Sequence, residues 1–263
     1  MLSALGTIDL IVLIVAVASS IGLGLYLSGR NTSVEAYLLG DRSLPWWAIL
    51  GSIVATETST ATVLSVPGEG FGPTGMRFLQ MALGYICGRW IVVQLLLPLY
   101  FRGTLSSAYE VLGDRFGERA KRTASLIFLV ARNLGDGLRL YLAASVLQIL
   151  VGWPLPLSAA VVGSVTIVYT YFGGMRSVVW NDCIQFVIYM LGGVASIFVI
   201  VAHIPGGWSE LWSYASEHDK LRVLDFDWNA KYSFWGGLFG GAFLTIGTHG
   251  TDQMMVQRYL SAR

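Results

Sequence analysis

The sequence predicts an all-α polytopic membrane protein, and three observations support this fold class. Hydrophobic residues make up 54% of the 263-residue chain and charged residues only 13%, whereas about 25% of the residues of a soluble domain are charged. Apolar runs long enough to cross roughly 30 Å of hydrocarbon as helices recur along the chain. The 9 tryptophans and 31 glycines are typical of membrane helices and of their ends at the lipid–water interface.

Seven segments are predicted to form membrane helices within a single transmembrane domain, residues 1–263. These segments are 8–27, 45–70, 76–101, 123–151, 155–172, 183–204 and 232–250. The first lacks the basic start of a signal peptide, because the first positive charge is Arg30, and it is therefore predicted to be a membrane helix. The sequence GGMRSVVWND, 173–182, is predicted to form a tight turn. The polar segment 205–231 is predicted to be a loop with a short surface helix.

The segment 45–70 starts as a membrane helix and then breaks its own apolar pattern. Its middle carries the polar residues Thr56, Glu57, Thr58, Ser59, Thr60 and Thr62. An ionisable residue at membrane depth is costly unless it faces protein, water or an ion. Hydroxyl and β-branched side chains favour a locally unwound helix, and broken helices of this kind hold ions and substrates in secondary transporters. The alternative is a polar contact between helices, since Ser and Thr also serve as packing residues in membranes.

The segment 123–151 also carries charges within an apolar helix. Arg132 and Asp136 are four residues apart, and Asp136 and Arg139 are three apart, so the carboxylate can pair with either guanidinium group. Pairing is the usual way in which charges persist inside a membrane. A structural role and a functional role for this intramembrane ion pair both remain open.

The basic residues predict the orientation of the helices, because cytoplasmic loops carry an excess of lysine and arginine. With the N-terminus outside, ten of the 17 basic residues, Arg258 among them, fall on the cytoplasmic side and four fall outside. The sequence therefore predicts a multi-pass protein of the plasma (inner) membrane with its N-terminus outside. The net charge of +1 argues against nucleic acid as a partner.

Four stretches, taken together and in this order, resemble the sodium:solute symporter family, which includes sodium/glucose, sodium/proline and sodium/iodide transporters. They are LPWWAILGSIVATETSTATVLSVPGEGF at 44–71, SSAYEVLGDRFG at 106–117, YFGGMRSVVWNDCIQ at 171–185 and GTDQMMVQRYLSAR at 250–263. The resemblance implies the LeuT fold, in which two inverted five-helix repeats follow an extra N-terminal helix. The chain would then hold the first repeat and the start of the second, and a C-terminal remainder of the transporter is expected.

The resemblance implies Na⁺ as the coupling ion and indicates which residues would hold it. The family's sodium site lies between the broken first core helix and the eighth core helix. In this chain, the sodium ligands from the first core helix would be the backbone carbonyls of Ala55 and Thr58. Glu57 stands where relatives often have Asp or Asn. Asp182 matches an acidic residue on the family's inward ion path. Oxygen ligands of this kind suit a hard cation.

The resemblance also implies that substrate contacts come from the first, second, third and sixth core helices. The candidate residues on these helices are Thr62, Gln80, Thr245, Thr248 and His249. A single histidine at a helix end is more often structural, so His249 is the weakest candidate. Sugar-binding relatives place a carboxylate on the second core helix, where this chain offers Gln80, so a sugar substrate is not indicated.

The sequence therefore predicts a sodium-coupled symporter that imports a small polar organic solute or a small anion by alternating access. Its partners would be sodium, the small-molecule substrate and the lipid bilayer. An enzyme is not expected, because the sequence lacks a His/Glu metal cluster, a nucleophile–base pair and a cofactor motif. A channel would need a continuous polar pore, whereas this sequence shows one broken helix and isolated polar patches. A transporter-like membrane sensor domain of a longer signalling protein remains the alternative.

Overall fold

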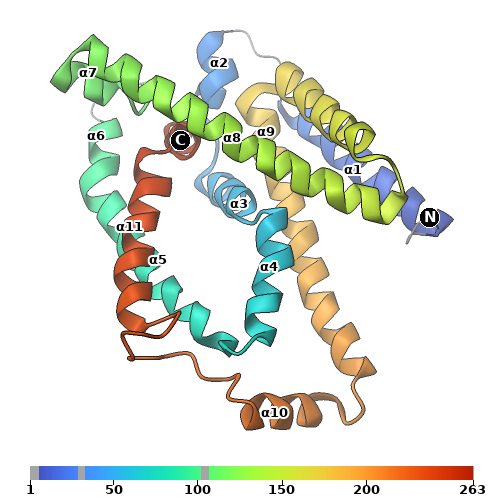
Figure 1. Ribbon diagram of the computed structural model, residues 1–263. Coiled ribbons are helices and arrows are strands. Elements are labelled where there is room, and N and C mark those ends of the chain that lie inside the picture. Colours follow the sequence, from blue (N-terminus) through green and yellow to red (C-terminus); the bar gives the residue numbers. More distant parts are fainter. Residues whose placement is uncertain (1–5, 29–32, 102–106, 263) are drawn as a thin grey trace. The chain divides into compact units, whose positions relative to one another are not determined.

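A computed structural model describes residues 6–28, 33–101 and 107–262 of the chain. The regular elements in these ranges are helices, apart from an isolated bridge between Leu44 and Ala262 (Figure 1). The chain divides into two compact units. The first comprises Met1–Ala61, Tyr109–Val187 and Gln257–Arg263, and the second comprises Thr62–Ala108 and Ile188–Val256. Arg30, Arg102 and Arg263, which the orientation prediction counts as cytoplasmic, lie outside the described residues.

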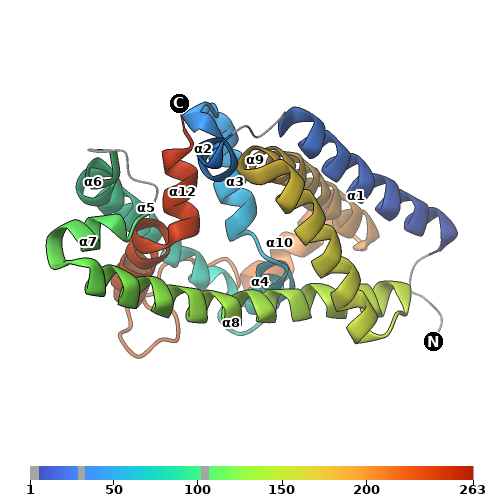
Figure 2. The ribbon, with the colours of Figure 1, turned by 90° about the horizontal axis from the view of Figure 1, so that it is seen from above.

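The first unit contains most of the long apolar helices. Its elements are α1 (Thr7–Ser28), α2 (Val34–Leu39), η1 (Gly40–Arg42), α3 (Trp46–Glu57), α7 (Glu110–Phe116), α8 (Glu118–Val151) and the first part of α9 (Leu155–His203). α1 covers the predicted segment 8–27. α8 covers the predicted segment 123–151 and runs through its charged middle without a break (Figure 2).

The core of the first unit lies between α3 and α9. Leu44, Ala48, Ile49 and Val179 are buried together. Leu44 lies just before α3, Ala48 and Ile49 lie in its first turn, and Val179 lies on α9. Trp47 packs edge-on against Trp180, with ring centroids 5.4 Å apart. This contact fixes the end of α3 that precedes the polar residues.

α9 differs from the predicted tight turn at 173–182. The kink is confined to Gly174, with φ 57° and ψ −156°, a conformation that is essentially restricted to glycine. One glycine is enough to redirect the chain, so residues 175–182 do not need to form a turn and are helical. Val179 and Asn181 are both buried there. The turn prediction was therefore too long, and α9 spans both predicted segments, 155–172 and 183–204.

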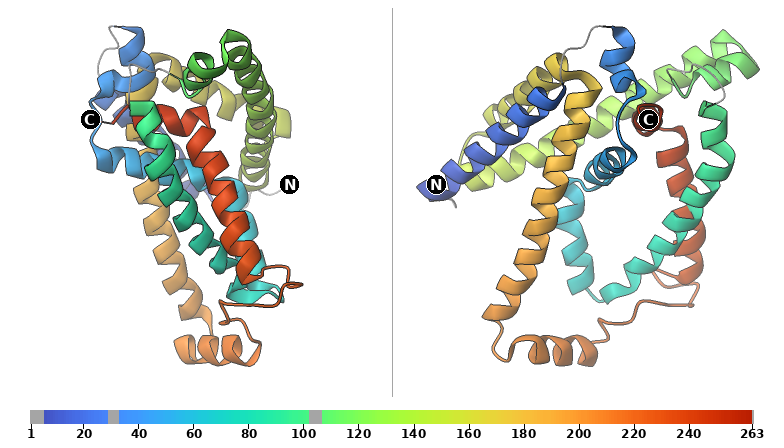
Figure 3. Two further views of the ribbon diagram at one scale, coloured as in Figure 1. Left: turned by 90° about the vertical axis from the view of Figure 1, so that its left-hand side faces the viewer. Right: turned by 180° about the vertical axis from the view of Figure 1, so that it is seen from behind.

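The second unit contains the close pair of helices α5 and α11. Its elements are the main part of α4 (Thr60–Phe71), η2 (Gly75–Gln80), α5 (Met81–Ile91), η3 (Val92–Leu96), α6 (Leu97–Phe101), the end of α9, α10 (Gly207–Glu217), η4 (Gly236–Gly240), α11 (Gly241–Thr245), η5 (Ile246–Thr251) and the start of α12 (Gln253–Leu260). α5 and α11 lie side by side (Figure 3). α10 falls within the segment predicted to be a loop with a short surface helix.

Four helices of the described chain are long and apolar enough to cross a membrane. They are Thr7–Leu27, Gly75–Phe101, Glu118–Val151 and Leu155–His203. The segments 45–70 and 232–250 do not appear among them. The first of these is divided between α3 and α4. In membranes, broken helices are tolerated where they are buried in protein or line a cavity.

Candidate functional site

The predicted break in the segment 45–70 is present in the structure. α3 ends at Glu57, Thr58 has φ −81° and ψ 88°, and α4 begins at Thr60. The Thr58 backbone N–H and its Oγ1 both donate to the Val54 carbonyl at 3.0 Å. The Thr58 hydroxyl thus competes with its own backbone N–H for the Val54 carbonyl, as expected for Ser and Thr near helix ends.

The break changes the partner of the Ala55 carbonyl. In a continuous helix, Ser59 N–H would donate to the carbonyl of Ala55, four residues earlier. Here Ser59 N–H donates to the Glu57 carbonyl at 3.1 Å instead. Ala55, Glu57 and Thr58 are half-buried, and the break withdraws the usual helical donor from the Ala55 carbonyl. A cation that prefers oxygen ligands is suited to such a site.

Asp182 belongs to a buried polar cluster with Ser52 and Arg258. Its Oδ2 accepts a hydrogen bond from Ser52 Oγ at 2.6 Å and contacts Arg258 Nη2 at 3.2 Å. Arg258 Nε also donates to Ser52 Oγ at 2.8 Å. The Arg258 side chain is only 4% exposed. A buried carboxylate needs such compensation, because an unpaired charge in a low-dielectric interior is strongly unfavourable.

Arg258 was not linked to Asp182 by the sequence. It was counted among the basic residues of the cytoplasmic side, and the structure buries its side chain against α3 and α9 within the first unit. The sequence feature that could have marked Arg258 as a functional residue was its place in the motif GTDQMMVQRYLSAR. A spacing argument could not reveal the pair, because 76 residues separate the two side chains.

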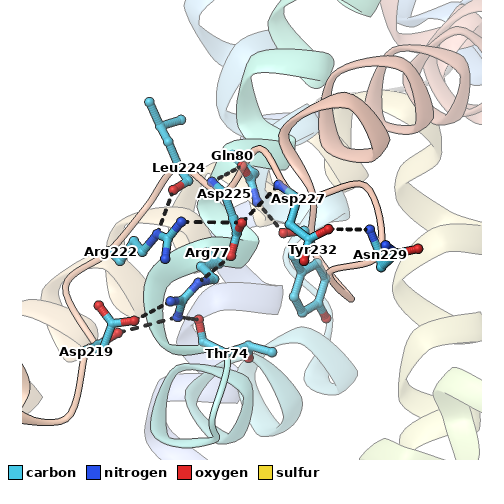
Figure 4. Close-up of polar contacts among 10 residues, drawn as sticks. All are labelled: Thr74, Arg77, Gln80, Asp219, Arg222, Leu224, Asp225, Asp227, Asn229 and Tyr232. Atoms are coloured by element: carbon cyan, nitrogen blue, oxygen red, sulfur yellow. Dashed lines mark hydrogen bonds and ion pairs between the residues drawn. The ribbon is translucent and has the colours of Figure 1, made fainter.

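In the second unit, Gln80 is buried and both ends of its side-chain amide contact backbone groups. Nε2 donates to the Tyr232 carbonyl at 2.6 Å, and Oε1 accepts from the Asp225 backbone N–H at 3.1 Å (Figure 4). Arg77 holds the same loop through Asp219 and through Asp225, whose Oδ2 lies 3.0 Å from Arg77 Nε. A solute that binds Gln80 would have to replace at least one of its two backbone contacts.

Thr245, Thr248 and His249 lie on α11 and η5. Thr245 is buried, and its Cβ lies on the side of α11 that faces Gly88 of α5. Thr248 Oγ1 donates to the Leu244 carbonyl at 3.0 Å and lies 3.1 Å from His249 Nδ1. His249 Nε2 lies 3.4 Å from Arg89 Nη2.

The remaining site candidates lie on α4 and α8. Thr62 is exposed on α4. Asp136 accepts from Arg132 Nε at 3.0 Å and from Arg139 Nη1 at 3.1 Å. The carboxylate thus contacts both guanidinium groups, at the spacings noted in the sequence. The described residues contain no cluster of three or more His, Cys, Asp or Glu side chains suited to a metal ion.

The helical architecture and the interrupted helix define a transporter of the LeuT fold. The chain matches the structure of a substrate-bound, outward-open Na⁺-coupled sialic acid symporter with a TM-score of 0.87 and 26% sequence identity. The match covers 98% of this chain and 54% of the symporter chain. The model of the sodium:solute symporter family matches residues 37–263. The chain therefore belongs to the sodium:solute symporter family, and the resemblance stated from its motifs is confirmed.

Curated relatives agree with this assignment. The chain is 31% identical to the sodium-dependent multivitamin transporter of Oryctolagus cuniculus, over 99% of this chain and 42% of the relative. It is 32% identical to the human sodium/iodide cotransporter, over 95% and 39%. It is 28% identical to the sodium-coupled monocarboxylate transporter 2 of Mus musculus, over 93% and 40%. These relatives are transporters and not enzymes, and the coupling ion of the family is Na⁺. The chain spans about 40% of the length of each of these curated relatives.

Proposed function

We propose that this chain is part of a sodium-coupled symporter that imports a small polar solute or a small anion by alternating access. The observation that carries the proposal is the interruption of the helical segment at Thr58, between α3 and α4. An interrupted helix offers carbonyl oxygens to an ion without exposing them to lipid. Because the chain spans about 40% of its relatives' length, it is proposed to act with a further part of the transporter.

In this proposal the sodium ligands of the broken helix are the carbonyl oxygens of Ala55 and Thr58. The transfer of the Ser59 N–H to the Glu57 carbonyl supports this assignment, because it withdraws the helical donor from Ala55. The Glu57 carboxylate, half-buried in the last turn of α3, adds negative charge close to the ion. Coupling then requires that sodium and solute favour the same conformation, and their binding linkage is reciprocal.

Asp182 is proposed to lie on the path by which sodium leaves toward the cytoplasm. Its Oδ2 contacts the Arg258 guanidinium and the Ser52 hydroxyl. A sodium ion that reaches this carboxylate must compete with Arg258 for the same oxygen. That competition favours release over tight binding, as a transport path requires.

A small anion is the solute class that we favour. Two of the relatives are named for iodide and for monocarboxylates, and the structural neighbour is named for sialic acid. The proposed solute contacts are Thr62, Gln80, Thr245, Thr248 and His249. Of these, Thr248 and His249 contact each other, and His249 lies beside the cationic Arg89. The distribution of basic residues supports a plasma (inner) membrane location with the N-terminus outside.

Sodium binding can be tested without knowing the solute. A chain of the relatives' full length that contains residues 1–263 would be melted in NaCl and in KCl of equal concentration. A bound ion stabilises the folded state by RT ln(1 + [L]/Kd), which is about 1.4 kcal/mol at ten times Kd. We expect a higher Tm in NaCl, and a smaller sodium effect in Glu57→Ala.

Glu69→Ala is the matched control, because Glu69 lies at the end of α4 and its carboxylate pairs with Lys231. This variant should keep the full difference between NaCl and KCl. Equal melting temperatures in the two salts for the unmodified chain would contradict the proposed sodium site. A normal sodium effect in Glu57→Ala would remove Glu57 from it.

A further inference from the structure

Aromatic side chains concentrate in one part of the second unit, between the end of α9 and the start of α11. Four of the chain's nine tryptophans lie within residues 205–235. The aromatic segment is defined here as residues 207–239, and its exposed aromatic residues are Trp208, Trp212, Tyr214, Phe226, Trp228 and Phe239. Trp and Tyr gather at membrane–water interfaces, where the ring meets the acyl boundary and the polar edge meets the headgroups.

α10, the helix of this segment, is amphipathic. Trp208, Leu211, Trp212 and Ala215 recur at the spacing of one helical face, since side chains three and four residues apart lie one above another. The glutamates of the helix, Glu210 and Glu217, lie on the opposite side. Trp208 and Trp212 are 55% and 66% exposed, so much of the indole surface of this stripe is uncovered by the protein.

The position of α10 follows from α9, which is long and apolar enough to cross a membrane. The last turns of α9 expose Phe198, Val199 and Ile200 at 63%, 57% and 59%. Three residues separate His203 from Gly207, and the four Cα–Cα steps of such a link reach at most about 14 Å. The polar interface on each side of the hydrocarbon is about 5–8 Å thick. The link turns tightly, since Gly207 N–H donates to the Ile204 carbonyl at 2.9 Å. α10 therefore starts close to the end of α9, which is close to the lipid headgroups when α9 spans the membrane.

α10 runs across the end of α9 and does not continue its direction (Figures 1 and 3). A helix that crosses the end of a membrane span at this depth lies along the interface plane. There an amphipathic helix can bury its apolar face among the headgroups and the first acyl carbons.

Charged contacts hold the other end of α10 in place. Asp219, two residues beyond the helix, pairs with Arg77 (Figure 4). Lys220 Nζ donates to the carbonyls of Phe71 and Gly72 at 2.7 Å. Gly75, with φ +55°, fits closely against the Lys220 backbone, where a Cβ atom would lie 2.8 Å from it. α10 is thus fixed at one end by α9 and at the other by η2, so its direction is defined by the fold.

The same segment ends in a stack of rings at the start of η4. Trp228 stacks on Trp235 with centroids 5.6 Å apart, and Trp235 on Phe239 at 6.3 Å. Trp228 is 71% exposed. Trp228 and Phe239 thus expose further aromatic surface at the end of the aromatic segment.

From these observations we propose that the α10 stripe, Trp208, Leu211, Trp212 and Ala215, docks onto the headgroup region of the lipid bilayer. The interaction is apolar and aromatic, since α10 carries two glutamates and no lysine or arginine. It requires no anionic lipid, in contrast to basic amphipathic helices. The helix anchors the loop that holds Gln80 through its backbone at Asp225 and Tyr232.

The test uses nitroxide labels on single cysteines in the full chain, reconstituted in phosphatidylcholine vesicles. Cys87 and Cys183 are first replaced by alanine. Labels at Trp208→Cys and Trp212→Cys report the stripe, and labels at Glu210→Cys and Ser213→Cys report the opposite face. Ile200→Cys on α9 serves as the lipid reference and Asn229→Cys as the water reference. Power saturation then measures access to oxygen, which partitions into lipid, and to a water-soluble nickel complex.

We expect a severalfold higher ratio of oxygen to nickel access at 208 and 212 than at 210 and 213. The ratio at the stripe should fall between those at 200 and at 229, and the pattern should be the same with added phosphatidylglycerol or at high salt. High nickel access at 208 and 212 would mean that the stripe faces water. Low access to both reagents would mean that protein covers it, and a pattern that appears only with anionic lipid would mean adsorption by charge. Each of these three results overturns the proposal.

Discussion

Asp182 and Arg258 form an ion pair that is mostly withdrawn from solvent, with 15% and 4% of their side chains exposed. Ser52 bridges them by donating to the carboxylate and accepting from the guanidinium. Each partner compensates the desolvation of the other, so the pair contributes little net stability while either partner alone is costly.

The first prediction is that Asp182→Asn lowers the stability of the first unit by about 3–5 kcal/mol, because it leaves the buried Arg258 charge uncompensated. The double variant Asp182→Asn with Arg258→Met should recover part of that loss, since no unpaired charge remains. Thermal melts of the three proteins in one detergent measure both effects. A double variant no more stable than Asp182→Asn would contradict the pairing as the source of the loss.

Asp225 ties the loop after α10 to η2. The backbone N–H of Asp227, together with the Arg77 and Arg222 guanidinium groups, holds the pKa of the Asp225 carboxyl below its usual value. A lowered folded-state pKa means that the carboxylate stabilises the fold above the ordinary aspartate pKa of about 3.9. That contribution is lost as the pH falls through the lower folded-state value.

We therefore predict that the loop 218–232 stays attached between pH 7 and pH 5 and loosens only below about pH 4. Hydrogen exchange of this segment, corrected for the intrinsic pH dependence of exchange, is the measurement. Asp225→Asn should loosen the loop at every pH and abolish the acid step. A step between pH 6 and 7 would instead assign the control of the loop to a histidine.

At the scale of elements, α5 and α11 approach closely because glycine lines their contact. A Cβ atom on Gly88 would lie 2.6 Å from the Ala242 carbonyl oxygen and 2.8 Å from Thr245 Cβ. Gly84 is similarly close to the backbone of Gly237 and Leu238. Small residues allow such close packing between membrane helices.

Gly88→Ala is predicted to destabilise the protein by about 1–3 kcal/mol, the usual cost of forcing extra volume into a packed contact. Gly240→Ala is the control on the facing helical stretch, since its Cβ position has no atom within 4 Å apart from its chain neighbours and its own helical backbone. There, alanine should be neutral or slightly stabilising, because its helix propensity is higher than that of glycine. Equal losses in the two variants, measured by thermal melting, would show that contact geometry is not the cause.

At the scale of the whole molecule, the chain spans about 40% of the length of the curated relatives and 54% of the structural neighbour. We predict that residues 1–263 alone show no uptake driven by a sodium gradient in liposomes. Alternating access requires one bundle to move against another around the site, and the family's sodium site also draws on its eighth core helix.

The measurement compares uptake of iodide, a monocarboxylate and sialic acid by residues 1–263 and by a full-length relative in parallel vesicles. A potassium gradient in place of sodium is the control for both. Sodium-driven uptake by residues 1–263 would contradict the prediction and would mean that copies of this chain complete one another's site.

The sequence by itself determined the features that depend on local pattern. Apolar runs predicted the positions of α1 and α8 and the two apolar stretches that α9 joins, because a helix in lipid must be apolar along its length. The polar residues around Glu57 predicted a break within the segment 45–70, which the structure places at Thr58, because hydroxyl groups compete for nearby carbonyls. The spacing of Arg132, Asp136 and Arg139 predicted their contacts, since residues three and four apart are neighbours on any helix.

Only the tertiary structure decided the contacts between residues far apart in the chain. It paired Arg258 with Asp182, bound both ends of the Gln80 amide to the backbone of a distant loop, and confined the kink of α9 to Gly174. Hydropathy and spacing describe one segment at a time, so they cannot select which buried polar group compensates which. That selection depends on how α3, α9 and α12 pack in the first unit and on how the loop after α10 folds back onto η2 in the second.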